Sequence, residues 1–263
     1  MARSNLITKK KARGEAYQKT GDQELLCLIE KVIKERPAYG YRRVTAFVRG
    51  QLKADRCAVV NHKRIYRLMK GNRLLLQKPL HRPKRAHDGK VRTLLSNTRW
   101  CSDSFSIQCA NGERVHVAFS LDSCDREVMR YIASTIGIDG QAIRDLMLET
   151  VEYRFGMPSV AAPVQWLSDN GSCYTARETV AFGKQLGLEI RTTLPYSPQS
   201  NGMAEAFVKT FKRDYVFFGD LTDAQMVMSQ LAKWMDDYNE KAPHKALKML
   251  SPREFLKEQK RAG

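Results

Sequence analysis

The sequence lacks several features that would each have indicated a different class of protein. It has no apolar run near the roughly 18 residues of a membrane-spanning helix, and no apolar stretch of signal-peptide type follows its basic first residues. Its six cysteines form no Cys-x-x-Cys pair or compact disulfide spacing, and its five histidines complete no zinc-ligand pattern. We therefore expect a cytoplasmic globular protein without a membrane segment, whose cysteines are reduced and buried.

The positive charge, by contrast, is abundant and unevenly distributed. Residues 1–95 contain 25 Lys and Arg against 7 Asp and Glu, whereas the rest of the chain contains 20 against 21. Basic side chains that neutralise phosphates release counterions, so this third of the chain is expected to bind nucleic acid in a salt-sensitive way. A solvated basic surface that only improves solubility is the alternative interpretation.

Apolar periodicity predicts three short helices in this basic third. The first follows Asp22 and ends before Pro37, the second covers residues 42–51, and the third begins after an Asn61 cap and ends at Gly71. Their expected buried residues are Leu25, Leu26, Ile29, Val32 and Ile33, then Val44, Phe47 and Val48, then Ile65, Leu68 and Met69. The pattern predicts a helix-turn-helix-like DNA-binding domain over residues 21–76, between a basic flexible arm (1–20) and a basic linker (77–97).

Basic side chains of these helices are the candidate DNA contacts. Opposite its apolar stripe the third helix carries Lys63, Arg64, Arg67 and Lys70. Lys and Arg in that place are also what any amphipathic helix displays, which is the structural alternative. Arg42 and Arg43, at the start of the second helix, are further candidates.

From Trp100 onward the pattern is typical of an α/β domain. Strands are predicted at 100–107, 115–121, 127–134, 164–167 and 188–192, with helices at 141–155 and 175–186. A hairpin meander followed by alternating helix and strand predicts a mixed sheet flanked by helices, which we assign to residues 98–220.

Residues 221–263 are expected to form a helical extension of this domain. Its main helix, residues 223–239, should bury Met226, Leu231, Trp234, Met235 and Tyr238. Ser251-Pro252-Arg253-Glu254 is typical of a capping box with proline at the first helical position, so it predicts a final helix.

Three acidic residues stand in distinctive contexts. They are Asp103 in Trp100-Cys101-Ser102-Asp103, Asp169 in Ser168-Asp169-Asn170-Gly171, and Glu205 in Ser197-Pro198-x-x-Asn201-Gly202-x-x-Glu205. Isolated carboxylates at strand ends are often merely solvated. A few rigidly placed ones can instead hold two Mg²⁺ ions about 3.5–4 Å apart, an arrangement that drives phosphodiester chemistry.

This ordered set, with 35 residues between Asp169 and Glu205, resembles the catalytic core of retroviral integrases and bacterial insertion-sequence transposases. The chain is most similar, over residues 37–254, to the second-frame (orfB-type) transposase of the insertion-sequence-three family. The resemblance implies a ribonuclease-H-like fold and a metal-dependent DNA strand transferase that cuts and joins DNA at element ends. It implies that Asp103, Asp169 and Glu205 are catalytic and bind two Mg²⁺ (or Mn²⁺) ions.

Residues around the three carboxylates extend the expected site. Lys209 and Lys212 lie four and seven residues after Glu205, on the same helical face, and a lysine at the seventh position is part of the resembled signature. Both could hold DNA phosphates, although an exposed helix face is the alternative for Lys209. Asn170 is a candidate DNA contact because its turn can bring backbone close to DNA, and residues 197–202 could act as a flap. Asp122 and Asp125 are expected to cap a turn or form a salt bridge.

The expected partners follow from this resemblance. They are DNA, both element ends and target, a second copy of the chain in a synaptic multimer, and an upstream-frame helix-turn-helix protein joined by frameshift fusion or association. Since that upstream segment is missing from this sequence, the chain would be only the catalytic part of the working enzyme, acting on DNA in a bacterial cytoplasm. The alternatives are a ribonuclease-H-like nuclease that only hydrolyses and a non-catalytic DNA-binding regulator.

Overall fold

The computed structural model describes residues 19–77, 93–160, 162–193 and 201–262. The chain divides into two compact units, Met1–Gln77 and Lys78–Gly263, each described here by itself. The predicted arm up to residue 18, most of the basic linker and residues 197–200 of the predicted flap lie outside the described residues. No helix in the described ranges is long and apolar enough to cross a membrane.

In its described residues, 19–77, the first unit is built from three helices, as predicted. They are α1 (Asp22–Glu35), α2 (Tyr41–Ala54) and α3 (His62–Gly71), and they bury one apolar cluster between them. The Asn61 side chain accepts a hydrogen bond from the backbone N–H of Lys63 at 2.9 Å, which confirms the predicted cap. The helix ends at Gly71, as predicted. Gly71 is still helical, however, and the C-cap position is taken by Asn72. Leu26, Ile33 and Phe47 are only partly buried, because they lie at the margins of the three contact faces.

The second unit contains one mixed sheet in the strand order β3-β2-β1-β4-β5. The strands are β1 (Arg99–Gln108), β2 (Arg114–Asp122), β3 (Val128–Ser134), β4 (Val164–Ser168) and β5 (Leu188–Thr192), close to the predicted ranges. β1 pairs with β2 antiparallel on one side and with β4 parallel on the other. The predicted hairpin meander is confirmed, and β4 extends the sheet beside β1.

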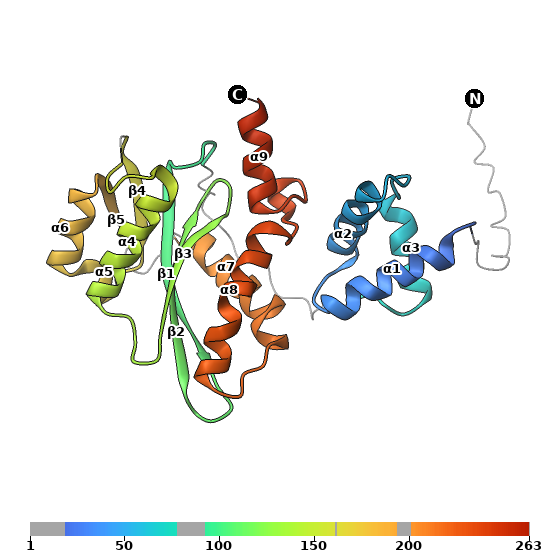
Figure 1. Cartoon of the computed structure of the whole chain (residues 1–263), viewed down its shortest axis with the longest axis horizontal. Helices are drawn as coiled ribbons and strands as arrows, with labels where there is room; N and C mark the ends of the chain where they lie inside the picture. Colours follow the sequence, from blue (N-terminus) through green and yellow to red (C-terminus); the bar gives the residue numbers. More distant parts are fainter. Residues whose placement is uncertain (1–18, 78–92, 161, 194–200, 263) are drawn as a thin grey trace, which may run out of the picture. The chain divides into compact units, whose positions relative to one another are not determined.

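Helices cover both faces of this sheet (Figure 1). On one face lie α4 (Gly140–Phe155), α5 (Ser172–Thr175) and α6 (Arg177–Gln185), and on the other lie α7 (Gly202–Asp214) and α8 (Ala224–Glu240). The helix predicted at 175–186 is observed as α6, but the separate short helix α5 was not predicted; Ala176 between them has an extended backbone with φ −53° and ψ 134°. The mixed sheet flanked by helices is therefore the observed architecture.

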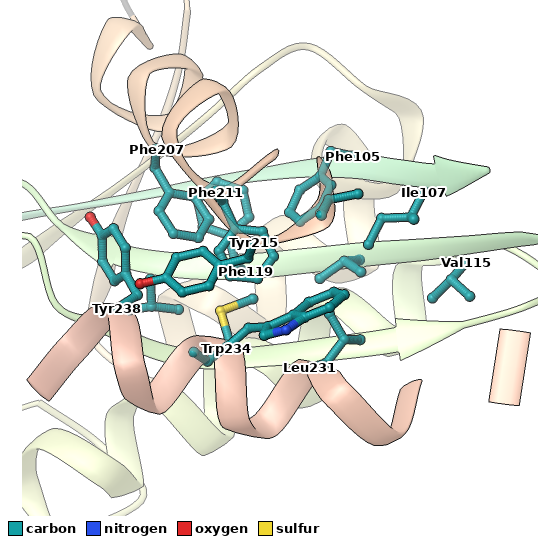
Figure 2. Packing of buried hydrophobic residues seen from close by; sticks show 14 of the residues in the cluster. Phe105, Ile107, Val115, Phe119, Phe207, Phe211, Tyr215, Leu231, Trp234 and Tyr238 are labelled. Carbon is teal, nitrogen blue, oxygen red and sulfur yellow. The ribbon is translucent and has the colours of Figure 1, made fainter. Parts of the chain in front are cut away.

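Aromatic side chains fill the space between the sheet, α7 and α8 (Figure 2). Phe207 of α7 packs on Phe119 of β2 with ring centroids 4.5 Å apart, and Phe211 packs on Phe105 of β1 at 5.7 Å. Tyr238 of α8 meets Phe207 edge-on at 5.0 Å. Each such pair adds to the free energy already gained by burying the rings, so α7 is held firmly against the strands.

One burial prediction for α8 is wrong. Met226 is 40% exposed, whereas Ala224 and Val227 take the buried positions of the first turn. The buried stripe continues through Leu231, Trp234 and Met235, and Met226 lies off it.

The C-terminal segment ends in α9 (Pro252–Ala262), which follows two short 3₁₀ turns, η1 (Val216–Phe218) and η2 (Lys245–Leu247). Ser251 Oγ accepts from the backbone N–H of Glu254, and the Glu254 carboxylate accepts from the backbone N–H of Ser251 at 2.8 Å. The predicted capping box is confirmed. Arg253 of this helix reaches the buried Glu127 at 3.1 Å, so α9 is tied to the start of β3.

Asp122 and Asp125 serve the turn between β2 and β3, as predicted. Asp122 accepts hydrogen bonds from the backbone N–H groups of Cys124 and Asn97, each at 2.7 Å. Asp125 forms an ion pair with Arg154 at 2.9 Å. Both carboxyl groups are buried, so these partners compensate the loss of hydration.

All six cysteines are free, as expected. Cys101 and Cys109 are buried, but Cys27 and Cys57 are exposed and Cys124 and Cys173 are intermediate. The expectation that the cysteines are buried is therefore wrong for Cys27 and Cys57, which lie off the apolar faces of the first unit.

The aromatic cluster makes a direct stability prediction. Phe211→Ala should lower the free energy of unfolding of the second unit by about 3–5 kcal/mol, because it leaves a cavity beneath α7. Phe217→Ala is the matched control, since Phe217 is 81% exposed and should cost under about 0.5 kcal/mol. Urea unfolding followed by tryptophan fluorescence reports on this unit alone, because Trp100, Trp166 and Trp234 all lie in it. Equal transition midpoints for the two variants would contradict the prediction.

Candidate active site

Asp103 and Asp169 are brought together by the pairing of β1 with β4. The register of this parallel pair ends with Trp100 opposite Trp166 and Cys101 opposite Leu167. Two residues further along each chain stand Asp103 and Asp169. Side chains two residues apart on a strand point to the same face, so the two carboxyl groups emerge at corresponding places on one side of the sheet.

Burial and two acidic neighbours change the pKa of Asp103. Partial burial, together with the negative charges of Asp169 and Glu205, raises the pKa of the Asp103 carboxyl from 3.8 to about 6, against a hydrogen bond from the backbone N–H of Ser104 that lowers it. Like charges favour the protonated form only when they are close. Asp169 and Glu205 therefore lie within effective electrostatic range of Asp103, although they come from different segments of the chain.

Asp169 follows β4 at the start of a tight turn. Its Oδ1 accepts a hydrogen bond from the backbone N–H of Gly171 at 3.0 Å. A Cβ atom at residue 171 would lie only 3.0 Å from that oxygen, so glycine permits the close approach. The neighbouring Asn170 is exposed, and its side-chain amide donates to the carbonyl of Thr193 just after β5. The turn is thus fixed from two sides while the Asp169 carboxylate stays open to solvent.

Glu205 lies in the first turn of α7, as its fourth residue, rather than ahead of the helix. Its carboxylate pairs with Lys209 one turn later, with Nζ to Oε2 3.1 Å. Lys212 follows on the same side of the helix, and its ammonium group lies 5.5 Å from the centre of the Phe105 ring. The predicted common face of Glu205, Lys209 and Lys212 therefore lies along α7 where it packs on β1.

The three carboxylates offer the hard oxygen ligands that Mg²⁺ and Mn²⁺ prefer. As placed, however, they do not form a ligand group. Among the described residues, no three His, Cys, Asp or Glu side chains stand close enough together to hold an ion. The Glu205 carboxylate is turned along its helix and pairs with Lys209.

The candidate DNA contacts of the first unit separate into two groups. Arg64 and Arg67 are directed at Asp22 at the start of α1, with nitrogen–oxygen distances of 2.7 and 2.6 Å. Burial of Asp22 acts against its ionised form, but hydrogen bonds from the Lys19 backbone, Arg64 and Arg67 prevail and lower its pKa to about 2. These two arginines hold α3 to α1, so their guanidinium groups are engaged within the domain.

The other face of α3 is exposed. Lys63, Tyr66 and Lys70 lie on it at helical spacing, and the Tyr66 ring packs edge-on against Tyr41 with centroids 5.1 Å apart. Arg42, next to Tyr41, is also exposed. Arg43 instead lies over the Tyr39 ring at 3.6 Å. Tyr66 and Tyr41 were not among the predicted contacts, although their spacing from Lys63 and Arg42 could have indicated them.

Two further residues of the core were not anticipated. The hydroxyl groups of Ser102 and Tyr174 are hydrogen-bonded at 3.0 Å in a fully buried position. Ser102 precedes Asp103, and Tyr174 belongs to α5, the short helix that follows Asp169. Nothing in the sequence around Tyr174 marks this role, because it depends on where α5 lies on the sheet.

Comparison with known proteins agrees with this architecture. Integrase core domain families match residues 95–198 and 186–252, and the HTH-like domain family matches residues 20–84. The chain is 48% identical over 247 residues to Transposase InsD for insertion element IS2A/D/F/H/I/K of Escherichia coli, covering 93% of this chain and 82% of that protein.

Solved structures show weaker similarity. One is the simian T-cell lymphotropic virus intasome in complex with the PP2A regulatory subunit B56 gamma, 19% identical, with a TM-score of 0.49 over 74% of this chain and 66% of that one. Another is the HTLV-2 integrase catalytic core domain in complex with magnesium, 15% identical, with a TM-score of 0.48 over 62% of this chain and 99% of that one. At these TM-scores the structural matches add no support of their own.

The fold and the family matches define the class. A ribonuclease-H-like integrase core with an N-terminal helix-turn-helix-like domain is that of a transposase, a polynucleotidyl transferase that acts on DNA. More particularly, the chain belongs to the family of the InsD transposases of insertion element IS2. The predicted fold class, enzyme class and insertion-sequence context are confirmed.

The raised pKa of Asp103 makes a prediction about stability. An aspartate whose pKa rises from 3.8 unfolded to about 6 folded destabilises the fold progressively as pH increases through that window. Asp103→Asn should therefore raise the melting temperature of the metal-free protein at pH 7, and this gain should disappear by about pH 4. Thermal unfolding in a chelator at both pH values measures it. Asp145→Asn on the exposed side of α4 is the control, and an Asp103→Asn midpoint unchanged at pH 7 would contradict the argument.

Proposed function

We propose that this transposase cuts and joins DNA strands with two Mg²⁺ (or Mn²⁺) ions held by Asp103, Asp169 and Glu205. Two observations support this most directly. The β1–β4 register ends two residues before Asp103 and Asp169, and the negative charges of Asp169 and Glu205 contribute to the raised pKa of Asp103.

The donor set suits the proposed ions. When bound, two such ions would activate the attacking oxygen and stabilise the leaving oxygen of a phosphodiester. Asp103 and Asp169 would contribute from the rigid sheet, and Glu205 by turning away from Lys209. That exposed ion pair contributes only about 0.3–0.5 kcal/mol, so it offers little resistance to the turn.

Basic and polar groups around the carboxylates are proposed to hold the DNA. Lys209 would be freed when Glu205 turns, and Lys212 stands on the same face with its stem against Phe105. Both would act as point charges on phosphates. Asn170 is proposed as a contact because its exposed turn adjoins Asp169.

The same arrangement serves two reactions. With water as the nucleophile the product is a cut strand, and with a terminal 3′-hydroxyl it is a joined one. Membership of a transposase family favours joining over the purely hydrolytic nuclease. The intact trio of carboxylates, in turn, argues against a regulator that only binds DNA.

In the first unit we propose that the exposed face of α3 contacts DNA. Lys63 and Lys70 would bind phosphates, Tyr66 would lie between them, and Arg42 would extend the surface from α2. We assign Arg64 and Arg67 to the stability of the domain, because both are engaged in ion pairs with Asp22. Arg43 adjoins this surface but packs on Tyr39, so it is a weaker candidate contact.

Finer assignments complete the proposal. They are membership of the insertion-sequence-three family as its second-frame protein, association with an upstream-frame helix-turn-helix protein, and a synaptic multimer of this chain acting in the bacterial cytoplasm. We propose the domain limits 21–76 for DNA binding, 98–220 for catalysis and 221–263 for the helical extension. All of these rest on the motif resemblance and on the need to bring two DNA ends together.

The catalytic proposal is tested with oligonucleotides carrying IS2-type element ends. Wild-type protein in Mg²⁺ or Mn²⁺ should give both cut and joined products, and Asp103→Asn, Asp169→Ala or Glu205→Gln should each reduce both by at least about a hundredfold. Asp145→Asn is the matched control, and the same duplex measures DNA binding by all variants. Cut products without joined ones would favour the hydrolytic nuclease. If Asp103→Asn retained full activity, the proposed site would be wrong.

The DNA-binding face is tested by the salt dependence of affinity. Lys63→Gln and Lys70→Gln should each weaken binding and reduce the slope of log affinity against log salt by about 1, because each removes one phosphate contact. Arg64→Gln and Arg67→Gln should leave the slope unchanged and instead speed amide exchange in α1 and α3. Fluorescence anisotropy and hydrogen exchange provide the two measurements. A reduced slope for the arginine variants, with unchanged exchange, would reverse the assignment.

A further inference from the structure

Asn201 occupies the N-cap position of α7 but does not cap it. Asn61, Asp139 and Asp223 hold the same position in α3, α4 and α8, and each accepts a hydrogen bond from a backbone N–H of its own helix. Within the described residues the Asn201 side chain makes no such bond. Asparagine is among the best N-cap residues, so the absence of a bond to the backbone N–H groups of α7 calls for another partner of this side chain.

The side chain of Asn201 binds the catalytic strand instead. Its Nδ2 donates to the backbone carbonyl of Ser102 at 3.2 Å, and the residue is only 6% exposed. Ser102 immediately precedes Asp103, and it stands one residue beyond Cys101, where the β1–β4 register ends. The bond therefore replaces strand pairing at the point where β1 and β4 separate.

The backbone of Asn201 is linked to Glu205. The carbonyl of Asn201 accepts the backbone N–H of Glu205 at 3.1 Å, the first hydrogen bond of the helix. One residue thus joins the peptide before Asp103 to the turn that carries Glu205. The chain of bonds runs from Ser102 through the Asn201 side chain and backbone to Glu205.

A second asparagine shows what a purely structural bridge looks like. Asn239 of α8 is 2% exposed and clamps Val128 of β3, accepting its N–H at 2.9 Å and donating to its carbonyl at 2.8 Å. Both halves of that amide are satisfied. The Oδ1 atom of Asn201, by contrast, is buried with no hydrogen-bond partner among the described residues. A buried unpaired acceptor costs the folded state free energy, so stability alone does not account for Asn201.

We propose that Asn201 is a positioning residue, which sets the separation between Glu205 and Asp103 through its bond to Ser102. This inference rests on the proposed role of the three carboxylates. Residues that orient ligands typically change metal affinity about 10–100-fold when they are removed, so the effect should be measurable. The aromatic packing of α7 fixes the helix as a body, whereas Asn201 fixes its first turn.

The first test measures position without metal or DNA. Amide hydrogen exchange of Glu205 and Ala206, the first hydrogen-bonded amides of α7, should become about tenfold faster in Asn201→Ala, since the first turn loses its tie to β1. Asn201→Ser keeps a residue that caps helices well but is too short to reach Ser102, so it should behave like Asn201→Ala. Asn239→Ala, which removes the other asparagine bridge, should leave exchange of Glu205 and Ala206 unchanged.

The second test measures function in the same variants. The divalent-ion concentration for half-maximal strand transfer should rise about tenfold in Asn201→Ala and Asn201→Ser, with DNA affinity unchanged. Asn239→Ala should lower the melting temperature without moving the metal requirement. A merely stabilising role for Asn201 would lower the melting temperature and leave that requirement where it was.

The outcomes separate the two proposals. Faster exchange together with a higher metal requirement in both Asn201 variants supports the positioning role. Wild-type behaviour of Asn201→Ser, unchanged exchange in Asn201→Ala, or a normal metal requirement despite faster exchange would each overturn it. If the wild-type protein gave no metal-dependent products at all, the proposed catalytic function would fail, and the exchange measurements would still decide whether Asn201 ties α7 to β1.

Discussion

The parallel pairing of β1 with β4 is the constraint on which the catalytic unit depends. Opposite Trp100 stands Trp166, and every side chain further along the two strands inherits that register. A slip of one residue would send the carboxylate of Asp103 or Asp169 to the other face of the sheet. The buried aromatic and aliphatic residues that pack on α4 to α6 therefore also determine where the two acids emerge.

Glu205 reaches the same region by a different kind of interaction. Its helix is held by ring contacts to Phe105 and Phe119, which position α7 on the sheet without regard to its polar face. Hydrophobic burial is strong but non-directional, so it places the helix axis better than it places one carboxylate. Directional hydrogen bonds of Asn201 set the orientation of the first turn of α7. The Glu205 carboxylate itself pairs with Lys209.

The first unit illustrates how charge can be misjudged from composition. Excess Lys and Arg in residues 1–95 pointed to a polyanion partner, and the HTH-like match agrees. Yet Arg64 and Arg67 are bound to Asp22, a contact across 42 and 45 residues. The exposed face of α3 therefore carries fewer basic side chains than the sequence pattern predicted, and it includes the exposed ring of Tyr66.

Local sequence determined the helices, the strands, the Asn61 cap and the Ser251–Glu254 capping box, because each depends on neighbours within a few residues. The ordered acidic motifs likewise indicated the enzyme class from sequence alone. Only the tertiary structure decided that α5 and α6 are separate, that Met226 is exposed, and that Arg64 and Arg67 face inward. It also revealed that Asn201 bonds to Ser102, 99 residues away. Such contacts depend on how elements far apart in the sequence pack together, and no pattern within a few residues determines that packing.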